Sequence, residues 1–220
     1  TLAGKTAFIT GGSTGIGLGM ATTFARHEMN VVITDIRDDA LTSAEQHLRQ
    51  ITERVLTLNV DSTDLDALAS AAKAVERTFG PLHLLCNNAG VTGGAKVLDT
   101  PEERWRMTHE VNFWGPHNGI KVFLPGMLEH GEDAHIVNTA SFSGIHGHGH
   151  QSGYGTSKFA LVGLSEFLRN DLADTNVGVS VLCPHVVDTP IIKALKTRVS
   201  ENVAQMIDAM AVAAETVGSQ

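Results

Sequence analysis

The sequence has little of several features that mark specialised classes of protein. Of its 220 residues only 2 are cysteine, and 16 lysines and arginines stand against 24 aspartates and glutamates, so the formal net charge is −8. Nucleic-acid binding normally relies on clustered basic side chains. Here these residues are few and scattered, which argues against a nucleic-acid partner. No apolar run is long enough to span a membrane, so we expect no membrane partner either.

The two cysteines and the 11 histidines do not form a recognisable metal motif. Cys86 and Cys183 lie in apolar runs at a separation that matches no zinc or redox spacing, so we interpret both as reduced core residues. His146, His148 and His150 alternate in a glycine-rich loop, which is not the spacing of a helical metal site, and no carboxylate lies nearby. We expect no bound metal and assign this loop to solvent or to a wall of the substrate pocket.

The length and composition favour one globular domain. A chain of 220 residues is long enough for one sizeable hydrophobic core and short for two. Neither a repeat of solenoid length nor a low-complexity segment is present. The N-terminus enters an apolar segment directly, without the pattern of a signal peptide. We therefore expect a single domain over residues 1–220, located in the cytoplasm.

Short β-branched runs alternate with longer segments of helical period. This alternation predicts a parallel sheet covered by helices on both faces, and right-handed crossovers make it a doubly wound α/β sheet of the Rossmann type with three layers. The predicted strands are Ala7–Thr10, Val31–Asp35, Val55–Asn59, Leu82–Asn87, His135–Thr139 and Val177–Cys183. The predicted helices cover residues 15–28, 38–50, 62–79, 103–131 and 152–173. Nothing after Thr189 has the pattern of a further strand.

A glycine-rich turn, TGGSTGIG, ends the first predicted strand and leads directly into a helix. Glycines there permit a tight turn and let the backbone approach a pyrophosphate, which the N–H groups and the dipole of the helix would hold. An ordinary strand–helix turn is the alternative. The candidate cofactor-binding residues in this turn are Gly11, Ser13, Thr14, Gly15, Ile16 and Gly17.

Asp35 ends the second predicted strand, 18 residues after Gly17. A carboxylate there can accept hydrogen bonds from the adenosine ribose hydroxyls. A 2′-phosphate would meet a like charge, with a repulsion of about 4 kcal/mol at ~4 Å and an effective dielectric of ~20, so NAD is favoured over NADP. In the alternatives, Asp35 only caps the following helix, or Arg37 holds a phosphate.

Taken with further motifs, this turn resembles the fingerprint of the classical short-chain dehydrogenase/reductase family. Three residues separate Gly11 from Gly15, and one separates Gly15 from Gly17. The resemblance extends from residue 3 to about 190. Its other elements are the fourth-strand motif 87–90, the helical Asn112, Ser141, and the Tyr-x-x-x-Lys pair formed by Tyr154 and Lys158.

The resemblance implies further contacts with a dinucleotide. Asp61 should meet the adenine, with residues 88–90 forming the floor under it, and residues 184–189 should contact the nicotinamide side. His185 stands where the family usually has glycine, which bears on the local backbone conformation. The residues implied here are Asp61, Asn88, Ala89, Gly90, Pro184, Val187 and Thr189.

Tyr154 and Lys158 lie four residues apart on a predicted helix and so share a face. A phenol with a pKa of about 10 is a poor base at neutral pH, and a nearby ammonium lowers that pKa. Tyr154 is predicted to take the proton of an alcohol while hydride passes to nicotinamide, or to donate it in reverse. Ser141 is suited to hydrogen-bond the substrate oxygen. The resemblance adds that Lys158 grips the nicotinamide ribose and that Asn112 holds a water of the proton relay.

We therefore expect an NAD-dependent oxidoreductase that acts on a secondary alcohol or ketone. The loops at about 91–100, 142–153 and 186–210 are predicted to select the substrate. The last one is either a lid over a hydrophobic substrate or an amphipathic helix packed on the body or on a partner subunit. The segment around Phe113 and Trp114 resembles a subgroup that oxidises bulky, including aromatic, secondary alcohols. Trp114 and Phe142 are candidate pocket neighbours.

Apolar residues on more than one face of the helix at 152–173 favour a homodimer or homotetramer, although burial by the sheet gives a similar pattern. Two other functions stay open. One is an NADPH-dependent carbonyl reductase in which Arg37 holds the 2′-phosphate. The other is a nucleotide-binding protein without turnover.

Overall fold

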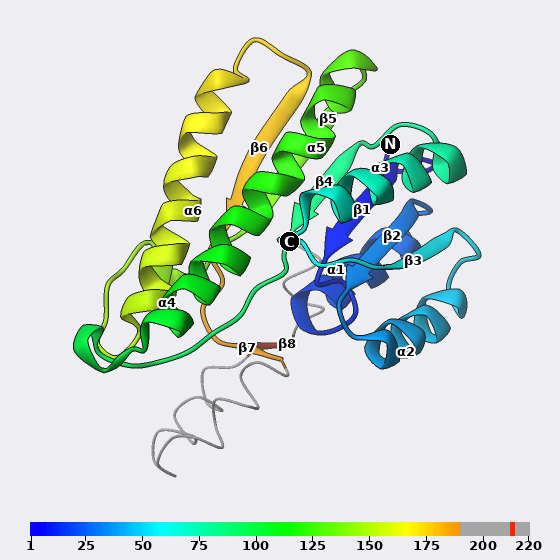
Figure 1. Ribbon diagram of the computed structural model, residues 1–220. Coiled ribbons are helices and arrows are strands. Elements are labelled where there is room, and N and C mark those ends of the chain that lie inside the picture. The colour runs from blue at the N-terminus through cyan, green and yellow to red at the C-terminus, as the bar shows by residue number, and fades with distance from the viewer. Residues whose placement is uncertain (190–211, 214–220) are drawn as a thin grey trace.

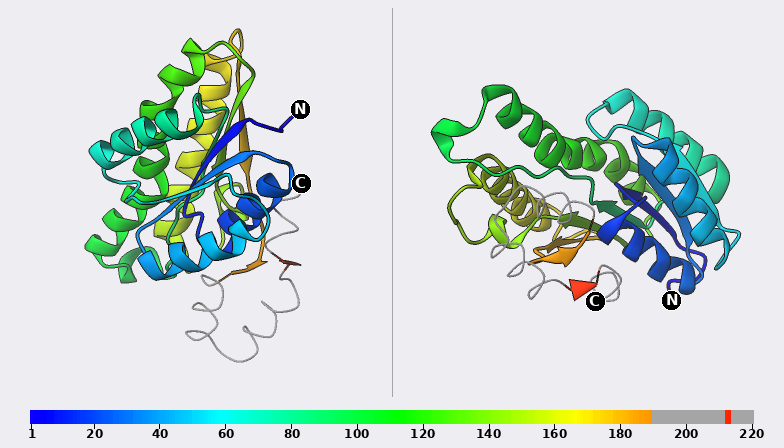
Figure 2. Two further views of the ribbon diagram at one scale, coloured as in Figure 1. Left: turned by 90° about the vertical axis from the view of Figure 1, so that its right-hand side faces the viewer. Right: turned by 90° about the horizontal axis from the view of Figure 1, so that it is seen from below.

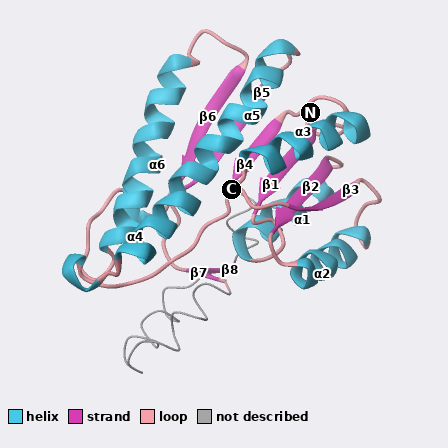
Figure 3. Ribbon diagram, in the orientation of Figure 1, coloured by secondary structure: helices cyan, strands magenta, loops and turns pink. Residues whose placement is uncertain are grey.

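The computed structural model describes residues 1–189 and 212–213 and contains a six-stranded parallel sheet of order β3-β2-β1-β4-β5-β6 (Figure 1). This confirms the predicted doubly wound α/β fold. The strands are β1 Thr6–Thr10, β2 Asn30–Asp35, β3 Val55–Asn59, β4 Leu84–Asn87, β5 Ala134–Thr139 and β6 Val177–Leu182. The helices are α1 Gly15–Arg26, α2 Asp38–Arg49, α3 Leu65–Phe79, α4 Glu102–His109, α5 Gly115–Glu129 and α6 Ser152–Asp171. One helix lies between successive strands along the chain, except between β4 and β5, where α4 and α5 follow each other (Figure 3).

Two hydrophobic cores lie on opposite faces of the sheet. One joins Phe8 of β1 to side chains of α3, α5 and α6, and the other joins Ala7 and Ile9 of β1 to α1 and α2 (Figure 2). Consecutive residues of β1 therefore enter different cores, and all five are buried. Burial on both faces explains why this strand has a continuous apolar run instead of an alternating pattern.

The predicted helix at 103–131 is wrong as a single element. It consists of α4, a π-helical turn η2 at Glu110–Trp114, and α5. Pro116 lies at the start of α5 and has no N–H to donate to the carbonyl of Asn112, so a regular α-helical bond is lost at that point. The widened turn places the side chain of Asn112 inside the protein, where it is fully buried.

Further differences concern one helix start and two short turns. The helix predicted from residue 62 begins at Leu65, because the carboxylate of Asp64 accepts hydrogen bonds from the N–H groups of Asp66 and Ala67 and caps it. Two 3-10 turns, η1 Val97–Asp99 and η3 Phe142–Gly144, were not predicted.

A small second sheet pairs β7, Val187–Asp188, with β8, Val212–Ala213. No strand was expected after Thr189, and β8 pairs with β7 and not with the main sheet. Residues 190–210 of the predicted lid lie outside the described residues. No helix of the described residues is both long and apolar enough to cross a membrane.

Candidate active site

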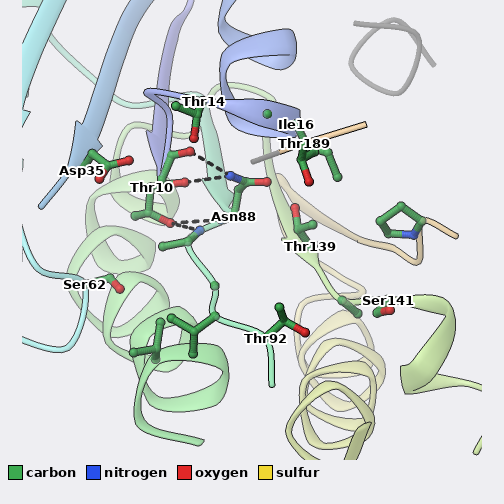
Figure 4. Close-up of a pocket in the computed structure, with 18 of the residues that line it drawn as sticks. Thr10, Thr14, Ile16, Asp35, Ser62, Asn88, Thr92, Thr139, Ser141 and Thr189 are labelled. Carbon is green, nitrogen blue, oxygen red and sulfur yellow. Dashed lines mark hydrogen bonds between the residues drawn. The ribbon is translucent and has the colours of Figure 1, made fainter. Parts of the chain in front are cut away.

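A cavity of about 420 Å³ lies at the carboxyl ends of the strands and extends from the glycine turn to α6 (Figure 4). Between β1 and β4 the strand order reverses direction, and ligands of open α/β sheets bind in the crevice beside such a switch point. The lining includes Gly11 and Asp35 at one end and Tyr154 and Lys158 at the other. The fold thus brings residues of both predicted sets into one cavity, whereas Ser13, Gly17 and Asn112 are buried and do not line it.

The glycine turn has a backbone that larger residues would not tolerate. Gly11 and Gly15 have φ of 61° and 55°, and a Cβ on Gly17 would lie 2.2 Å from the Gly11 carbonyl oxygen. Helix α1 follows Thr14, whose side chain does not cap it, and the first turn of α1 contains no acidic residue. The N–H groups and dipole of this helix end therefore face the cavity as a ready site for an anion.

Asn88 holds the glycine turn in place. Its side-chain Nδ2 donates to the carbonyl oxygens of Thr10 and Gly11, both at 3.1 Å, and the backbone N–H groups of Asn88 and Ala89 donate to Thr10 Oγ1 at 3.0 Å (Figure 4). The resemblance assigns residues 88–90 only to the floor under the adenine, and Thr10 is not among the predicted site residues. The sequence does contain a signal for Thr10: this threonine directly precedes Gly11 and ends β1 beside the glycine turn.

At the adenosine end, Asp35 is 8% exposed and is bound by Arg37. Arg37 Nε donates to Asp35 Oδ1 and Nη2 donates to Oδ2, both at 3.0 Å, and Ser13 Oγ also donates to Oδ2. Burial acts to raise the pKa of Asp35, but the hydrogen bonds from Arg37 and Ser13 outweigh it and hold the pKa below its usual value. The carboxylate is therefore charged at neutral pH.

Asp61 lines the same end of the cavity, and its contact with the adenine stays a prediction. Its Oδ1 accepts hydrogen bonds from the N–H and the hydroxyl of Thr63, both at 2.9 Å. The exposed Ile36 and the buried Val60 also line this end and were not predicted.

At the catalytic end, Tyr154 and Lys158 come from the first turns of α6, and Ser141 follows β5. Lys158 is 3% exposed, and its Nζ donates to the carbonyl oxygen of Thr139 at 2.8 Å. Burial lowers the pKa of this ammonium to about 8. The same Nζ lies 5.9 Å from the centre of the Tyr154 ring, so the predicted pair is brought together.

The expected lowering of the Tyr154 pKa by Lys158 is wrong for this structure. Burial raises the pKa of Tyr154 above its ordinary value, and the hydrogen bond with Ser141 opposes this only partly. The physical reason is that the phenol is removed from water, while the ammonium is directed to the Thr139 carbonyl.

Asn112 joins two segments at the catalytic end through hydrogen bonds to Val91 and Ser157. Its Oδ1 accepts from the N–H of Val91 at 2.8 Å, and its Nδ2 donates to the Val91 carbonyl and to Ser157 Oγ, both at 3.0 Å. A Cβ on Gly90 would lie 3.3 Å from Asn112 Oδ1 and 3.5 Å from Lys158 Nζ, so Gly90 lies at this end of the cavity. The role of Asn112 in a water relay stays a prediction.

The segment after β6 runs beside the one that carries Ser141. The N–H of Phe142 donates to the Pro184 carbonyl at 2.9 Å, and Pro184, Val187 and Thr189 line the cavity. Their contact with the nicotinamide side stays a prediction. His185 lines the cavity too, with its ring centre 5.0 Å from that of Phe142. Its backbone does not take a positive φ, so histidine fits here without strain.

Cys86 is buried as expected, but Cys183 is not a core residue. It is half-buried, and its thiol is near the Ser141 N–H and the Lys158 ammonium. Burial raises the pKa of this thiol. Because β6 ends at Leu182, the apolar run that contains Cys183 reaches the cavity edge instead of the core.

The histidine loop and Trp114 lie outside the cavity walls. His146, His148 and His150 are exposed and do not line the cavity, and the described residues contain no group of side chains suited to hold a metal ion. Trp114 packs edge-on against Phe113 and His117. Of the two candidate pocket neighbours, Trp114 and Phe142, only Phe142 is near the site, because its ring packs against that of His185, which lines the cavity.

A family model described as short chain dehydrogenase matches residues 5–200 of this sequence. The chain belongs to this family. A similar relative is 1-deoxy-11-beta-hydroxypentalenate dehydrogenase of Streptomyces exfoliatus, which is 37% identical over 193 residues, or 87% of this chain and 70% of that protein. Membership in the short-chain dehydrogenase family confirms the resemblance found in the sequence and makes the chain an oxidoreductase.

Two solved structures of short-chain dehydrogenase type match almost the whole chain. A short chain dehydrogenase/reductase from Burkholderia phymatum in complex with NAD has a TM-score of 0.91 and 32% identity, covering 99% of this chain and 84% of that one. A variant of actinorhodin polyketide ketoreductase with NADPH has a TM-score of 0.93 and 29% identity, covering 98% and 87%. The two solved structures therefore share this fold and each contains a nicotinamide nucleotide, but one contains NAD and the other NADPH.

Proposed function

We propose that the chain is an NAD-dependent oxidoreductase that transfers hydride between a secondary alcohol, or the corresponding ketone, and nicotinamide. The observation that carries this proposal is the single cavity that joins the glycine turn and Asp35 to Ser141, Tyr154 and Lys158. A nucleotide held at the first end would extend toward the proton-transfer groups at the second.

The residues of this structure fit a dinucleotide. The positive φ of Gly11 and Gly15, which shapes the turn, and the uncapped N-terminus of α1 suit a pyrophosphate held by backbone N–H groups. Asp35 would accept hydrogen bonds from the adenosine ribose, and Lys158 would hold the nicotinamide ribose. The Thr139 hydroxyl lines the cavity and has no hydrogen-bond partner among the described residues. When bound, the cofactor supplies the carbon that accepts or gives the hydride.

The proton is moved by Tyr154 with help from Ser141. In alcohol oxidation, the hydroxyl proton of the substrate passes to the phenolate oxygen of Tyr154, while the carbinol carbon loses a hydride; in ketone reduction, the phenol returns the proton to the substrate oxygen. Ser141, which is hydrogen-bonded to Tyr154, would hold that oxygen. Because burial keeps Tyr154 protonated at neutral pH, the acid form needed for reduction is the resting form. For oxidation the phenol must first release its proton to solvent, and the positive charge of Lys158 nearby would stabilise the phenolate that remains.

The choice of NAD rests on the charged carboxylate of Asp35. It is supported by the Burkholderia phymatum structure, which contains NAD. A second candidate is an NADPH-dependent carbonyl reductase, which is favoured by Arg37 beside Asp35 and by the ketoreductase structure with NADPH.

We propose that the substrate is bulky and hydrophobic, as the name of the hydroxypentalenate dehydrogenase relative implies for that protein. A homodimer or homotetramer is part of the same proposal, supported by Phe159 and Phe167 of α6, which are 45% and 74% exposed. Light scattering that gave the monomer mass of 23.4 kDa would contradict it. The cytoplasmic location stays a prediction.

A screen of secondary alcohols with the purified protein tests the activity. Each alcohol is incubated with NAD, and in parallel with NADP, and the absorbance of the reduced cofactor is followed. We expect turnover of at least one bulky secondary alcohol, with a higher kcat/KM for NAD. Turnover with NADP alone would favour the second candidate, and no turnover in either direction would contradict an enzymatic function.

A further inference from the structure

Ser143 lies just behind the catalytic end of the cavity, in the 3-10 turn η3 that follows Ser141. Its side chain is buried, with 6% of the residue exposed, and it does not line the cavity. Its backbone N–H donates to Ser141 Oγ at 3.1 Å. A serine hydroxyl has one proton to donate and two lone pairs that accept. Because Ser143 uses a lone pair of Ser141, the proton of Ser141 remains for its hydrogen bond with Tyr154.

The side chain of Ser143 is hydrogen-bonded to the start of the helix that carries Tyr154. Ser143 Oγ donates to Gln151 Oε1 at 3.1 Å, and Gln151 directly precedes α6. His148 Nε2 lies 3.1 Å from the same amide oxygen and 3.4 Å from Ser143 Oγ. The hydrogen bond from Ser143 to Gln151, called the Ser143–Gln151 bridge below, therefore connects the turn after Ser141 to the beginning of α6.

Two glycines let the backbones of these segments approach each other. A Cβ on Gly144 would lie 2.8 Å from the Lys158 carbonyl oxygen, and a Cβ on Gly155 would lie 3.5 Å from the Ser143 carbonyl oxygen. The turn η3 therefore packs directly on the part of α6 that carries Tyr154 and Lys158. Close packing brings the two segments together, and the Ser143–Gln151 bridge adds a directional contact that packing alone does not supply.

We propose that Ser143 and Gln151 are positioning residues, which hold the Ser141 hydroxyl against the Tyr154 phenol through their bridge. This inference rests on the proposed function, because it assigns the two residues to the same proton transfer. Neither residue lines the cavity, so both act through Ser141 instead of touching substrate or cofactor. Misplacement of a catalytic group by about 1 Å can cost about 100-fold in rate, so a contact behind the cavity can change turnover.

Steady-state kinetics and NAD titration of the full chain test the Ser143–Gln151 bridge. Ser143→Ala and Gln151→Leu each remove one partner, and we expect kcat to fall about tenfold while the Kd for NAD stays within about twofold. Gln151→Glu keeps an acceptor oxygen for Ser143 Oγ and should retain kcat within about twofold. In a Ser141→Ala background, Ser143→Ala should cause no further fall of kcat, because the hydroxyl that it positions is already absent.

Tyr154 provides a second measurement that needs no turnover, because it is the only tyrosine of the sequence. Isotopic labelling of the phenolic carbon therefore gives one NMR signal, and its pH titration measures the pKa of Tyr154. Burial raises this pKa, and the hydrogen bond with Ser141 opposes the rise. Ser143→Ala and Gln151→Leu weaken that hydrogen bond, so in both variants the midpoint of the titration should rise by about half a pH unit.

Ser165→Ala is the matched control, since Ser165 is also a buried serine and its Oγ joins α6 to Asn138 of β5. This variant should unfold at a lower temperature but keep the wild-type kcat and the wild-type titration midpoint of Tyr154.

The outcomes separate the bridge from the proposed function. An unchanged kcat or an unchanged midpoint in both Ser143→Ala and Gln151→Leu would overturn the positioning role while leaving an active oxidoreductase. An equal fall of kcat in Ser165→Ala would overturn it as well, because any loosening of α6 would then have the same effect. If the wild-type protein turned over no alcohol or ketone, the proposed function would be wrong, and the positioning role with it.

Discussion

The two ends of the cavity are built on the same edge of the sheet but are held together by different interactions. At the adenosine end, Asp35 and Arg37 form a charged pair whose arginine is half-exposed. At the catalytic end, Lys158 is buried without a carboxylate partner among the described residues, and its Nζ donates to a backbone carbonyl. Asn112 fixes the surroundings through neutral hydrogen bonds.

This difference matches what each end has to do. A charged pair with one half-exposed member can exchange its hydrogen bonds for those of a ligand, which suits the binding of a cofactor. A buried ammonium held by neutral groups keeps a fixed position and an altered pKa, which suits proton transfer. Substitutions at one end should therefore change binding, and substitutions at the other end should change turnover.

The largest expected effect is at the catalytic end, from Tyr154→Phe. The variant lacks the hydroxyl that carries the proton, so kcat should fall about 10³-fold. The Kd for NAD should stay within about threefold, because the glycine turn and Asp35 are untouched. Steady-state kinetics and NAD titration measure the two quantities. Activity close to that of the wild type would mean that another group transfers the proton.

Gly17→Ala should disturb the glycine turn, at the end of the cavity opposite to Tyr154. A methyl group there would lie 2.2 Å from the Gly11 carbonyl oxygen and 2.6 Å from Asn88 Nδ2, so the turn would have to open. We expect the Kd for NAD to rise about 100-fold and the free energy of unfolding to fall by about 2 kcal/mol.

Gly126→Ala is the matched control for that variant, since nothing lies within 4 Å of a Cβ at this position of α5. It should leave NAD binding unchanged and stabilise the helix by about 0.5–1 kcal/mol. Equal NAD affinity in both alanine variants would show that the close contact at Gly17 is not needed for the cofactor site.

Lys158→Met should separate stability from activity at the catalytic end. Burial lowers the pKa of Lys158 from 10.5 to about 8, so at pH 7 the folded protein carries the cost of a buried charge. Methionine removes that cost but leaves the Thr139 carbonyl unpaired, and we expect a net gain of about 2 kcal/mol in the free energy of unfolding at pH 7, together with loss of turnover.

The pH dependence of this gain has a definite sign. Between pH 8 and 10.5 the folded wild-type protein releases the Lys158 proton while the unfolded chain keeps it, so the stability of the wild type rises with pH. The advantage of Lys158→Met should therefore shrink from pH 7 to pH 9.5 in urea unfolding experiments. An advantage that is constant with pH, or a variant less stable at pH 7, would show that the buried ammonium is not the cause.

The two ends of the cavity also show which site residues can be predicted from the sequence and which cannot. Asp35, the glycine turn and the Tyr154–Lys158 pair were predictable because each depends on local spacing along one strand end or one helix. The ion pair between Asp35 and Arg37 was not predictable, because two charged residues at positions i and i+2 after a strand are usually both solvated. The π-turn at Asn112 was also missed, since a proline near a helix start does not disturb the apolar period that predicts the helix. Cys183 was misplaced because an apolar run does not show where its strand ends.

The smallest predicted effect concerns His185, a side chain on the cavity wall. It contacts the aromatic ring of Phe142 instead of a charged group, so it differs from both ends of the cavity. Its ring packs against Phe142, and the hydrogen bond from the Phe142 N–H to the Pro184 carbonyl keeps these segments together without the histidine. His185→Gly should therefore leave the Kd for NAD within about twofold and change the KM for the substrate by about three- to tenfold, because only the wall beside Ser141 is altered. His185→Phe should restore the packing but not the polar edge, so a KM that recovers in this variant would assign the histidine a packing role, and one that does not would assign it a polar contact with the substrate. A large loss of NAD affinity in both variants would contradict the separation of the two ends, since a wall residue would then be part of the cofactor site.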